Sequence, residues 1–319
     1  MTLNVLKPGV QTTVQGSPRT GLRHFGMPWS GPADPLSLAM ANRLCGNDLR
    51  APGLEVTFGN FECLFTEERL VAVTGADASV TIDGRPQAMH RALRVGAGER
   101  VAIGPAQRGM RIYLATGGGI DVKTAFGSPS TYLPGGFGGH EGRALREGDR
   151  LALGRQGPAH EGDATPAELR SVFGTSTILR VVPSAEFERL TAKSRREIFE
   201  KPFMAGTQID RMGIRLKDNP VSLRPAPPMN SAAVFPGTIQ CPEGGEPIIL
   251  GPDAQTTGGY ARILSVATVD TYLLGQITPR SQVRFFLKTP EAAVADLVLR
   301  ERLLESWLGG QSARSFSSA

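Results

Sequence analysis

Glycine and proline divide this sequence into many short runs of β-branched and apolar residues. The 319-residue chain holds 39 glycines and 24 prolines, and each run between them is long enough for only one strand. This punctuation is typical of an all-β sandwich or barrel and not of alternating strands and helices, because glycine and proline mark turns. We therefore predict a mainly β protein.

The expected strands of the first half lie between residues 53 and 154. They read GLEVTF, FECLF, RLVAVTG, SVTIDG, RALRVG, RVAIG, RIYLATGG and RLALG. The Asp83-Gly84 pair predicts a tight hairpin turn. One helix precedes these strands, since Asp34 can cap it, Pro35 suits its first position and Gly46 ends it.

The composition along the chain predicts four segments. Residues 1–154 form a first β-barrel subdomain, and 155–174 form a linker rich in Gly, Pro, Ala and charge. Residues 175–288 form a second β-barrel subdomain with an amphipathic helix near 185–199. A C-terminal helix and a disordered tail occupy 289–319, and the apolar stripe of that helix could face the core or a partner.

Charge and cysteine usage exclude several classes of protein. The net charge is +5, but the 35 basic residues are interspersed with 30 acidic ones, so nucleic acid is not an expected partner, whereas a small anion is. Cys45, Cys63 and Cys241 are too far apart for a zinc site or a disulfide framework. The four histidines suggest no metal set. Without an apolar leader or a spanning run, we expect a cytoplasmic protein with no membrane partner.

Polar residues gather in a glycine-rich loop that leads into the first helix. We expect Arg19 and His24 to bind substrate there and Asp34 to act in catalysis, because glycines let the backbone approach a ligand closely. The alternatives are that His24 is structural and that Asp34 merely caps its helix.

A second polar group lies in three stretches of the second half, 210–216, 236–242 and 253–260. Either Arg211 or Arg262 could hold a substrate carboxylate in a bidentate fork, and Asp210 and Asp253 are candidate catalytic bases. Four uncharged residues could hydrogen-bond an amide or urea-like group. They are Gln240, Gln255, Thr256 and Thr257. Alternatively, Asp210 and Arg211 form a local ion pair and Thr-Thr-Gly-Gly is an ordinary turn.

The common catalytic signatures are missing from the sequence. It has no Walker phosphate loop, His-Glu-x-x-His motif, Gly-x-Ser-x-Gly elbow or biotin attachment site. Two glycine-rich stretches, 117–119 and 135–139, could offer backbone N–H groups to a phosphate. Since neither clearly opens a helix after a strand, tight turns explain them more simply.

Ordered motifs over residues 3–287 resemble one protein family. They include GVQTTVQ, GMPWSGPAD, GLEVTFGN, YLATGGGI, DRMGIRL, PGTIQCPEGGEPIIL and DAQTTGGYARI. The chain is similar to allophanate hydrolase subunit 2, the C-type subunit of 5-oxoprolinase, an antagonist of a sporulation-kinase inhibitor, and half of the carboxyltransferase domain of urea carboxylase, taken as its subdomains C and D. The resemblance implies two cyclophilin-like β-barrel subdomains.

The same resemblance implies an activity. We expect a subunit of an ATP-dependent lactam hydrolase that converts 5-oxoproline to L-glutamate, inactive alone, with a homologue of subunit 1 (the B-type subunit) and a third subunit as partners. ATP with Mg²⁺ would be the cofactor, bound by this chain or by the complex. The alternatives are a carboxyltransferase that uses carboxybiotin on urea or a related amide, and a non-catalytic regulator that binds a kinase inhibitor.

Three positions depart from the family pattern. Gly16 stands where the family usually has Asp, Ala33 replaces Met in Gly-Pro-Met-Asp, and Ile209 replaces the Ser before Asp-Arg-Met-Gly. If the missing Asp binds substrate or metal in the family, this chain has a different substrate or has lost activity.

Overall fold

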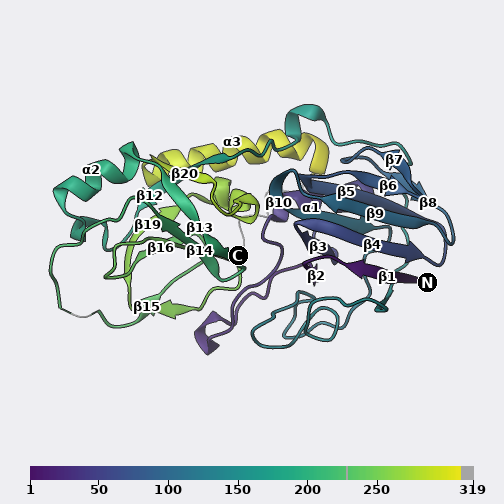
Figure 1. Ribbon diagram of the computed structural model, residues 1–319, viewed down its shortest axis with the longest axis horizontal. Helices are drawn as coiled ribbons and strands as arrows, with labels where there is room; N and C mark the ends of the chain where they lie inside the picture. The colour runs from purple at the N-terminus through teal and green to yellow at the C-terminus, as the bar shows by residue number, and fades with distance from the viewer. Residues whose placement is uncertain (228, 310–319) are drawn as a thin grey trace. The chain divides into compact units, whose positions relative to one another are not determined.

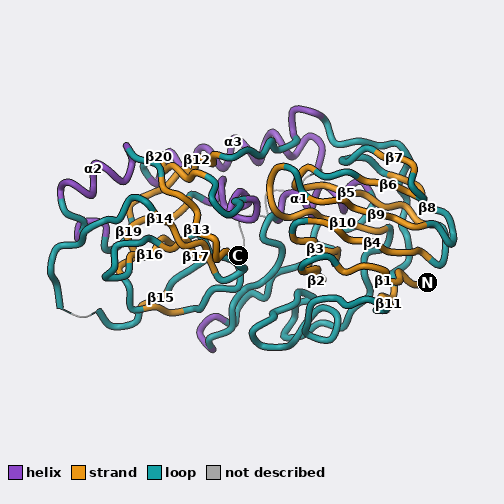
Figure 2. Tube along the Cα trace, viewed as in Figure 1, coloured by secondary structure: helices purple, strands orange, loops and turns teal. Residues whose placement is uncertain are grey.

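The computed structural model describes residues 1–227 and 229–309 and divides the chain into two compact units (Figure 1). Unit 1 comprises Met1–Thr20, Ser30–Phe173 and the segment from Leu304; unit 2 comprises Gly21–Trp29 and Gly174–Leu303. Strands make up most of the regular structure (Figure 2). The prediction of a mainly β protein is confirmed.

Unit 1 is built from two antiparallel sheets. In spatial order, the first contains β11 (Arg150–Ala152), β1 (Thr2–Pro8), β4 (Gly59–Phe65), β9 (Arg100–Pro105), β6 (Val80–Ile82) and β7 (Arg85–Gln87). The second contains β2 (Gln11–Gln15), β3 (Gly53–Thr57), β10 (Arg108–Thr116), β5 (Arg69–Asp77) and β8 (Leu93–Val95). Asp83 and Gly84 form the predicted turn between β6 and β7, both with positive φ, as a two-residue hairpin of this kind requires.

One apolar core joins the two sheets of unit 1. Leu3 of β1 and Phe61 of β4 belong to the same buried cluster as Leu54 of β3 and Ile112 of β10, and all four are fully buried. Among the described residues, no ladder of hydrogen bonds connects one sheet to the other. In the described residues the first β subdomain is therefore built as a two-sheet sandwich.

Helix α1 (Pro35–Leu44) covers the second sheet of unit 1. It contacts β5 and β10, where Ala41 of the helix meets Ala72 and Ala115 in a buried cluster. Small side chains at this contact let the helix lie close to the strands. The helix prediction is confirmed at both ends, since Pro35 is its first residue and Gly46 follows it with positive φ.

Unit 2 is organised around a closed barrel. Its strands are, in order, β12 (Ser176–Pro183), β19 (Ala261–Val266), β16 (Thr238–Cys241), β17 (Ile248–Leu250), β14 (Gly213–Lys217), β13 (Phe203–Ile209) and β20 (Gln282–Leu287). A parallel pairing of β20 with β12 closes the ring. Two short strands, β15 (Ala232–Ala233) and β18 (Thr257–Gly258), pair beside it. The expected second barrel is confirmed.

Helices complete the chain. Helix α2 (Ala192–Glu200) begins later than predicted, because Thr191 caps it by accepting a hydrogen bond from the Ser194 amide at 3.3 Å. Helix α3 (Pro290–Leu308) begins at the predicted proline, and the expected disordered tail lies outside the described residues. Short 3₁₀ turns are η1 (Arg23–Phe25), η2 (Ala167–Leu169), η3 (Phe187–Arg189) and η4 (Thr268–Gln276). In the described part of the chain, no helix is long and apolar enough to cross a membrane.

Candidate functional site

Arg19, a predicted substrate-binding residue, is completely buried in unit 1. Its Nε donates to the carbonyl of Ala125 at 3.1 Å, its Nη1 to the hydroxyl of Ser30 at 3.1 Å, and its Nη2 to the carbonyl of Ser130. The guanidinium also lies 4.9 Å from the ring centre of Phe137. Arg19 therefore fixes the loop around residues 125–137 and is not open to a ligand.

Asp34 is the N-cap of α1. Its Oδ1 accepts from the Ser37 amide at 2.9 Å and its Oδ2 from the Ser37 hydroxyl at 2.6 Å, and the side chain is fully buried. Such a cap satisfies N–H groups that have no partner inside the helix. The capping alternative is confirmed, and the geometry gives no support to the predicted catalytic role.

A buried network holds the backbone next to Asp34. Oε2 of Glu55 accepts from the Ala33 amide and from the Tyr113 hydroxyl, both at 2.8 Å, and the Asp34 amide donates to Tyr113 Oη at 2.8 Å. Burial and the neighbouring Glu55 carboxylate raise the pKa of Tyr113 well above its ordinary value. Tyr113 thus stays protonated and donates to Glu55, and together they hold the backbone at Ala33 and Asp34.

In unit 2 the barrel brings the predicted stretches together. β14 pairs with β17, and β16 pairs with both β17 and β19. Nε of Arg211 lies 2.7 Å from Oδ2 of Asp253 and Nη2 lies 3.1 Å from Oδ1, and both side chains are almost fully buried. The expected carboxylate fork and the expected base are thus bonded to each other.

Asp210 serves its own turn. It is exposed, and its Oδ1 accepts from the amides of Met212 at 2.7 Å and Gly213 at 3.1 Å. An aspartate that bonds the backbone two or three residues ahead stabilises the turn locally. This role explains the residue without catalysis.

Arg262 is also engaged. Its Nε and Nη2 donate to the two carboxylate oxygens of Glu186 at 2.8 and 2.7 Å, and its Nη1 donates to the Ala233 carbonyl at 3.2 Å. Hydrogen bonds from Arg262 lower the pKa of Glu186 despite its partial burial. With a bidentate carboxylate already in place, Arg262 is not the predicted anchor for a substrate carboxylate.

The predicted uncharged polar residues do lie together, and we call Gln240, Gln255, Thr256 and Thr257 the glutamine site. Gln240 is buried, its Oε1 accepts from Gln255 Nε2 at 3.3 Å, and its Nε2 donates to the Tyr260 carbonyl at 3.5 Å. Gln255 and Thr257 are exposed. Gln255 and Thr257 can therefore present donors and acceptors to an amide, while Gln240 supports Gln255 from within the protein.

Gly258 makes room for the buried glutamine. A Cβ atom at this position would lie 2.5 Å from Nε2 of Gln240, too close for any real contact. Its φ is not in the left-handed region, so the glycine is required here by close approach and not by backbone conformation. The Thr-Thr-Gly-Gly run is therefore part of the glutamine site and not only a turn.

His24 and its neighbour Arg23 lie in the segment that belongs to unit 2. His24 is exposed, with its ring 4.0 Å from that of Phe25. Arg23 instead turns onto the protein, where its Nη2 donates to the Val234 carbonyl. The sequence pointed to His24 and missed Arg23, because in a turn of three residues nothing local decides which side chain faces the protein.

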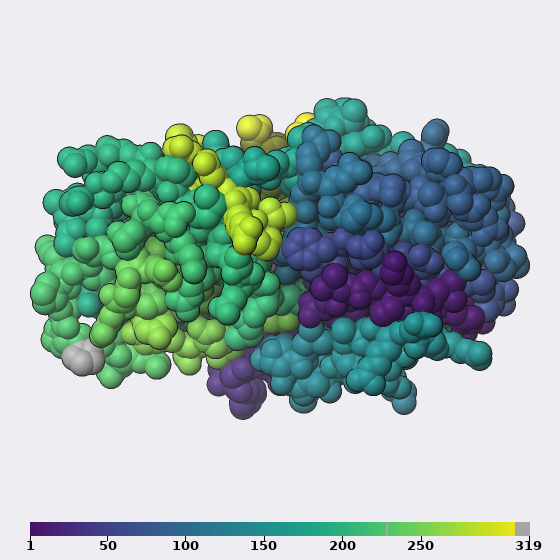
Figure 3. Space-filling model, viewed as in Figure 1, coloured from purple at the N-terminus to yellow at the C-terminus, as the bar shows by residue number. Residues whose placement is uncertain are grey.

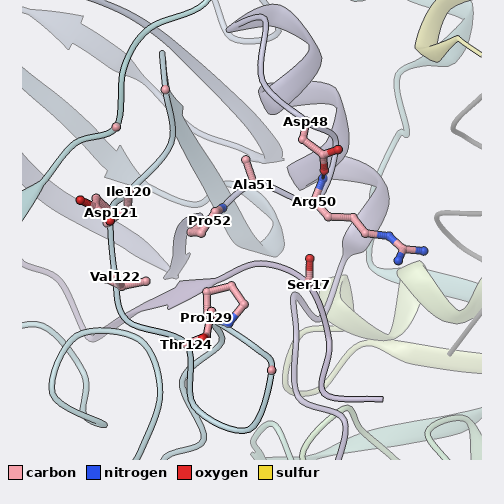
Figure 4. Close-up of a pocket in the computed structure, with 13 residues that line it drawn as sticks. Ser17, Asp48, Arg50, Ala51, Pro52, Ile120, Asp121, Val122, Thr124 and Pro129 are labelled. Carbon is pink, nitrogen blue, oxygen red and sulfur yellow. Dashed lines mark hydrogen bonds between the residues drawn. The ribbon is translucent and has the colours of Figure 1, made fainter. Parts of the chain in front are cut away.

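A pocket of about 450 Å³ opens on unit 1 (Figure 4). Ser17 and Pro129 line it, and Figure 4 shows Arg50 and Asp121 on opposite sides of it. Its lining includes none of the predicted site residues. Gly16 lies behind this wall: a Cβ atom there would come within 2.9 Å of Pro129 Cγ and 3.1 Å of the Arg50 carbonyl oxygen. An aspartate at this position would require both to shift, so Gly16 is matched to the packing of this chain.

Several amides of the two glycine-rich stretches already donate within the protein. The amides of Gly117, Gly118 and Gly119 donate to the Leu70 carbonyl, Asn47 Oδ1 and the Thr116 carbonyl, at 2.7 to 2.8 Å. The amide of Gly139 donates to the Pro129 carbonyl at 2.9 Å. Both stretches form turns, which is the simpler of the two explanations that the sequence allowed. Within residues 1–227 and 229–309, no group of three His, Cys, Asp or Glu side chains could hold a metal ion.

The whole chain resembles known proteins. It is 35% identical to the C subunit of 5-oxoprolinase from Escherichia coli, an alignment that covers 95% of this chain and 96% of that protein. It is 32% identical to urea amidolyase of Lachancea kluyveri over 88% of this chain but only 16% of that protein. The crystal structure of urea carboxylase from Kluyveromyces lactis matches with a TM-score of 0.90 and 28% identity, over 97% of this chain and 29% of that one.

The family model for the carboxyltransferase domain, subdomain A and B, matches residues 25–287. The chain belongs to this family. The expected likeness to subdomains C and D is thereby corrected to A and B. The match to urea carboxylase covers only 29% of that longer chain, so the same arrangement of strands also occurs as one segment of a larger protein.

Proposed function

We propose that this member of the carboxyltransferase A and B family is the C-type subunit of an ATP-dependent 5-oxoprolinase, which converts 5-oxoproline to L-glutamate. The observation that carries the proposal is the end-to-end match to the E. coli protein, 95% of one chain and 96% of the other. The urea amidolyase match leaves most of that longer protein without a counterpart in this chain.

In this proposal the chain recognises the lactam, and partners complete the site. The glutamine site offers hydrogen bonds to the lactam amide, while Asp34, Asp210 and Asp253 are occupied by structural bonds. ATP and Mg²⁺ would bind on a homologue of the B-type subunit or on a third subunit. The chain would therefore be inactive alone, and the complex would work in the cytoplasm.

Carboxyl transfer from carboxybiotin to urea or a related amide is the second candidate. The family description and the fold shared with K. lactis urea carboxylase favour it. An amide-binding glutamine site suits urea as well as a lactam. That reaction would require a biotin carboxylase partner to supply carboxybiotin, whereas the 5-oxoprolinase reaction would not.

The test is to co-express the chain with the B-type homologue and the third subunit of the same genome, purify the complex, and measure 5-oxoproline-dependent release of ADP and glutamate. We expect turnover by the complex and none by this chain alone. Urea-dependent consumption of carboxybiotin, with no release of glutamate from 5-oxoproline, would replace this proposal with the second candidate.

One variant pair connects that activity to the glutamine site. Gln255→Ala removes an exposed carboxamide whose recorded bond is to Gln240, and we expect KM to rise about 3- to 10-fold, the value of one neutral hydrogen bond. Gln282→Ala changes an exposed glutamine on β20 and should leave KM unchanged. Equal effects of the two variants would argue against the glutamine site.

A further inference from the structure

Arg23 sits in a turn that glycine makes possible. η1 is flanked by Gly21 and Gly26, whose φ angles of 79° and 80° are in the left-handed region that favours glycine. A Cβ atom at either position would meet nothing within 4 Å, so backbone conformation and not crowding calls for these glycines. The resulting turn presents Arg23 to the rest of unit 2.

Two aromatic rings hold the Arg23 guanidinium. Its central carbon lies 4.9 Å from the ring centre of Trp29 and 4.9 Å from that of Phe235, and the two rings are 5.8 Å apart. Cation–π contacts of this kind are stronger when the charge is partly removed from water. The planar group is therefore fixed in orientation before any ligand arrives, which lowers the entropy lost on binding.

The charge of Arg23 is not neutralised within the described chain. Its Nη2 donates to the Val234 carbonyl, but its Nη1 is buried and has no hydrogen-bond partner among residues 1–227 and 229–309. Arg211 and Arg262, in contrast, are each paired with a carboxylate. Burial lowers the pKa of Arg23, the direction expected for a cation without a compensating anion.

Val234 connects Arg23 to the glutamine site. Its carbonyl accepts from Arg23, and its amide donates to the Thr256 carbonyl at 3.0 Å. The preceding carbonyl, that of Ala233, accepts from Arg262. Val234 directly follows β15 and Thr256 directly precedes β18, so the Arg23 contact and part of the glutamine site lie at the same end of this strand pair.

We propose that Arg23 binds the carboxylate of the substrate through its guanidinium, so that the chain selects lactams that carry an adjacent carboxylate over neutral lactams or urea. This inference rests on the proposed function. A carboxylate would supply the counter-charge that this partly buried guanidinium does not find among residues 1–227 and 229–309, and an uncompensated charge is costly to bury. Arg23 thus takes the role that the sequence predicted for Arg211 or Arg262, which is to bind the substrate carboxylate.

The test uses the assembled complex and two substrates, 5-oxoproline and 2-pyrrolidone, which is the same lactam without the carboxylate. We expect Arg23→Gln to raise KM for 5-oxoproline about 10- to 100-fold, the value of a charged hydrogen bond, with kcat changed much less. The kinetics with 2-pyrrolidone should stay as in the wild type. Arg196→Gln, which replaces an exposed arginine on α2, is the matched control and should leave KM and kcat unchanged for both substrates.

Phe235→Leu provides a second variant that keeps the charge and removes one ring. It should raise KM for 5-oxoproline about 3- to 10-fold, as expected for one cation–π contact, and it carries the test if Arg23→Gln does not assemble. If the wild-type complex is active and the Arg23→Gln complex keeps the wild-type KM, the role of Arg23 is overturned while the proposed function stands. The same holds for Phe235→Leu where it replaces Arg23→Gln. A wild-type complex that does not cleave 5-oxoproline overturns the proposed function together with this inference.

Discussion

The motif residues of unit 1 and those of unit 2 have similar chemistry but opposite surroundings. In unit 1, Arg19 and Asp34 are fully buried, and the bonds described above tie both to the protein itself. In unit 2, Gln255 and Thr257 are exposed and Nη1 of Arg23 has no acceptor in the described chain. A polar motif therefore indicates a ligand site only where its hydrogen-bond donors and acceptors are not already bonded within the protein.

The same contrast exists within unit 2. Arg211 and Asp253 resemble the residues of unit 1, because they are buried and bonded to each other. Two loops meet there at close range, since a Cβ atom at Gly251 would lie 2.4 Å from the Arg211 carbonyl oxygen. The pair thus ties the loop that holds Asp253 to the loop that holds Arg211.

The largest expected effect comes from Asp253→Ala. Removing one partner of a buried ion pair leaves a buried charge, which costs about 3 to 5 kcal/mol of unfolding free energy. Urea unfolding of the chain would measure it. The fluorescence of Trp29 in a Trp307→Phe background reports unit 2, since Trp29 belongs to that unit and Trp307 to unit 1.

Asp210→Ala, which removes an exposed aspartate of the same barrel, is the control for Asp253→Ala and should cost much less. If Asp253→Ala instead abolished turnover of the complex without loss of unfolding free energy, Asp253 would be a catalytic base. A buried and bonded residue of unit 2 would then be functional, which would contradict the contrast drawn above.

The next effect is an acid-dependent loss of stability in unit 1. Hydrogen bonds from Arg143 lower the pKa of Asp149 from 3.8 to about 2. Because the folded-state pKa is depressed, the stabilisation is present above pH 3.8 and is lost as the pH falls toward 2. We expect the unfolding free energy to drop by roughly 2 kcal/mol across this range from Asp149.

Urea unfolding at several pH values, read from Trp307 in a Trp29→Phe background, would follow unit 1. Asp149→Asn should flatten the pH dependence, since an amide does not titrate. A drop of the same size in the Asn variant would assign the acid sensitivity to other carboxylates.

Asp34→Ala should have a smaller effect, about 0.5 to 2 kcal/mol, the usual cost of losing an N-cap. Asp34→Ser should recover part of it, because serine can accept from the same amide. We expect complexes that assemble to keep the wild-type kcat and KM in both variants. A loss of kcat that serine does not recover would restore the catalytic role predicted for Asp34.

Gly258→Ala should leave stability nearly unchanged and alter binding. The new Cβ must displace the Gln240 carboxamide, so we expect KM to rise about 3- to 10-fold while the unfolding free energy changes by less than about 1 kcal/mol. Gly244→Ala adds a methyl group where no atom lies within 4 Å and is the matched control. An unchanged KM for Gly258→Ala would remove Gln240 from the glutamine site.

Much of the fold could be predicted because its signals are local. Turn chemistry at Asp83-Gly84 and the cap and stop of α1 depend on neighbouring residues, and the structure has both. Closure of a barrel is not local. The strands of unit 1 and unit 2 look alike in sequence, yet in the part of the chain that the structure describes only those of unit 2 close, by pairing β20 with β12.

The sequence by itself determined the mainly β architecture, the strand boundaries near glycine and proline, and which polar residues are candidates for a site. Only the tertiary structure decided which candidates remain open. Arg211 finds its partner 42 residues away at Asp253, and Arg23 turns inward while His24 stays exposed. The physical reason is that hydrogen-bond partners are set by which loops the barrel brings together, and no local pattern of residue types encodes that contact.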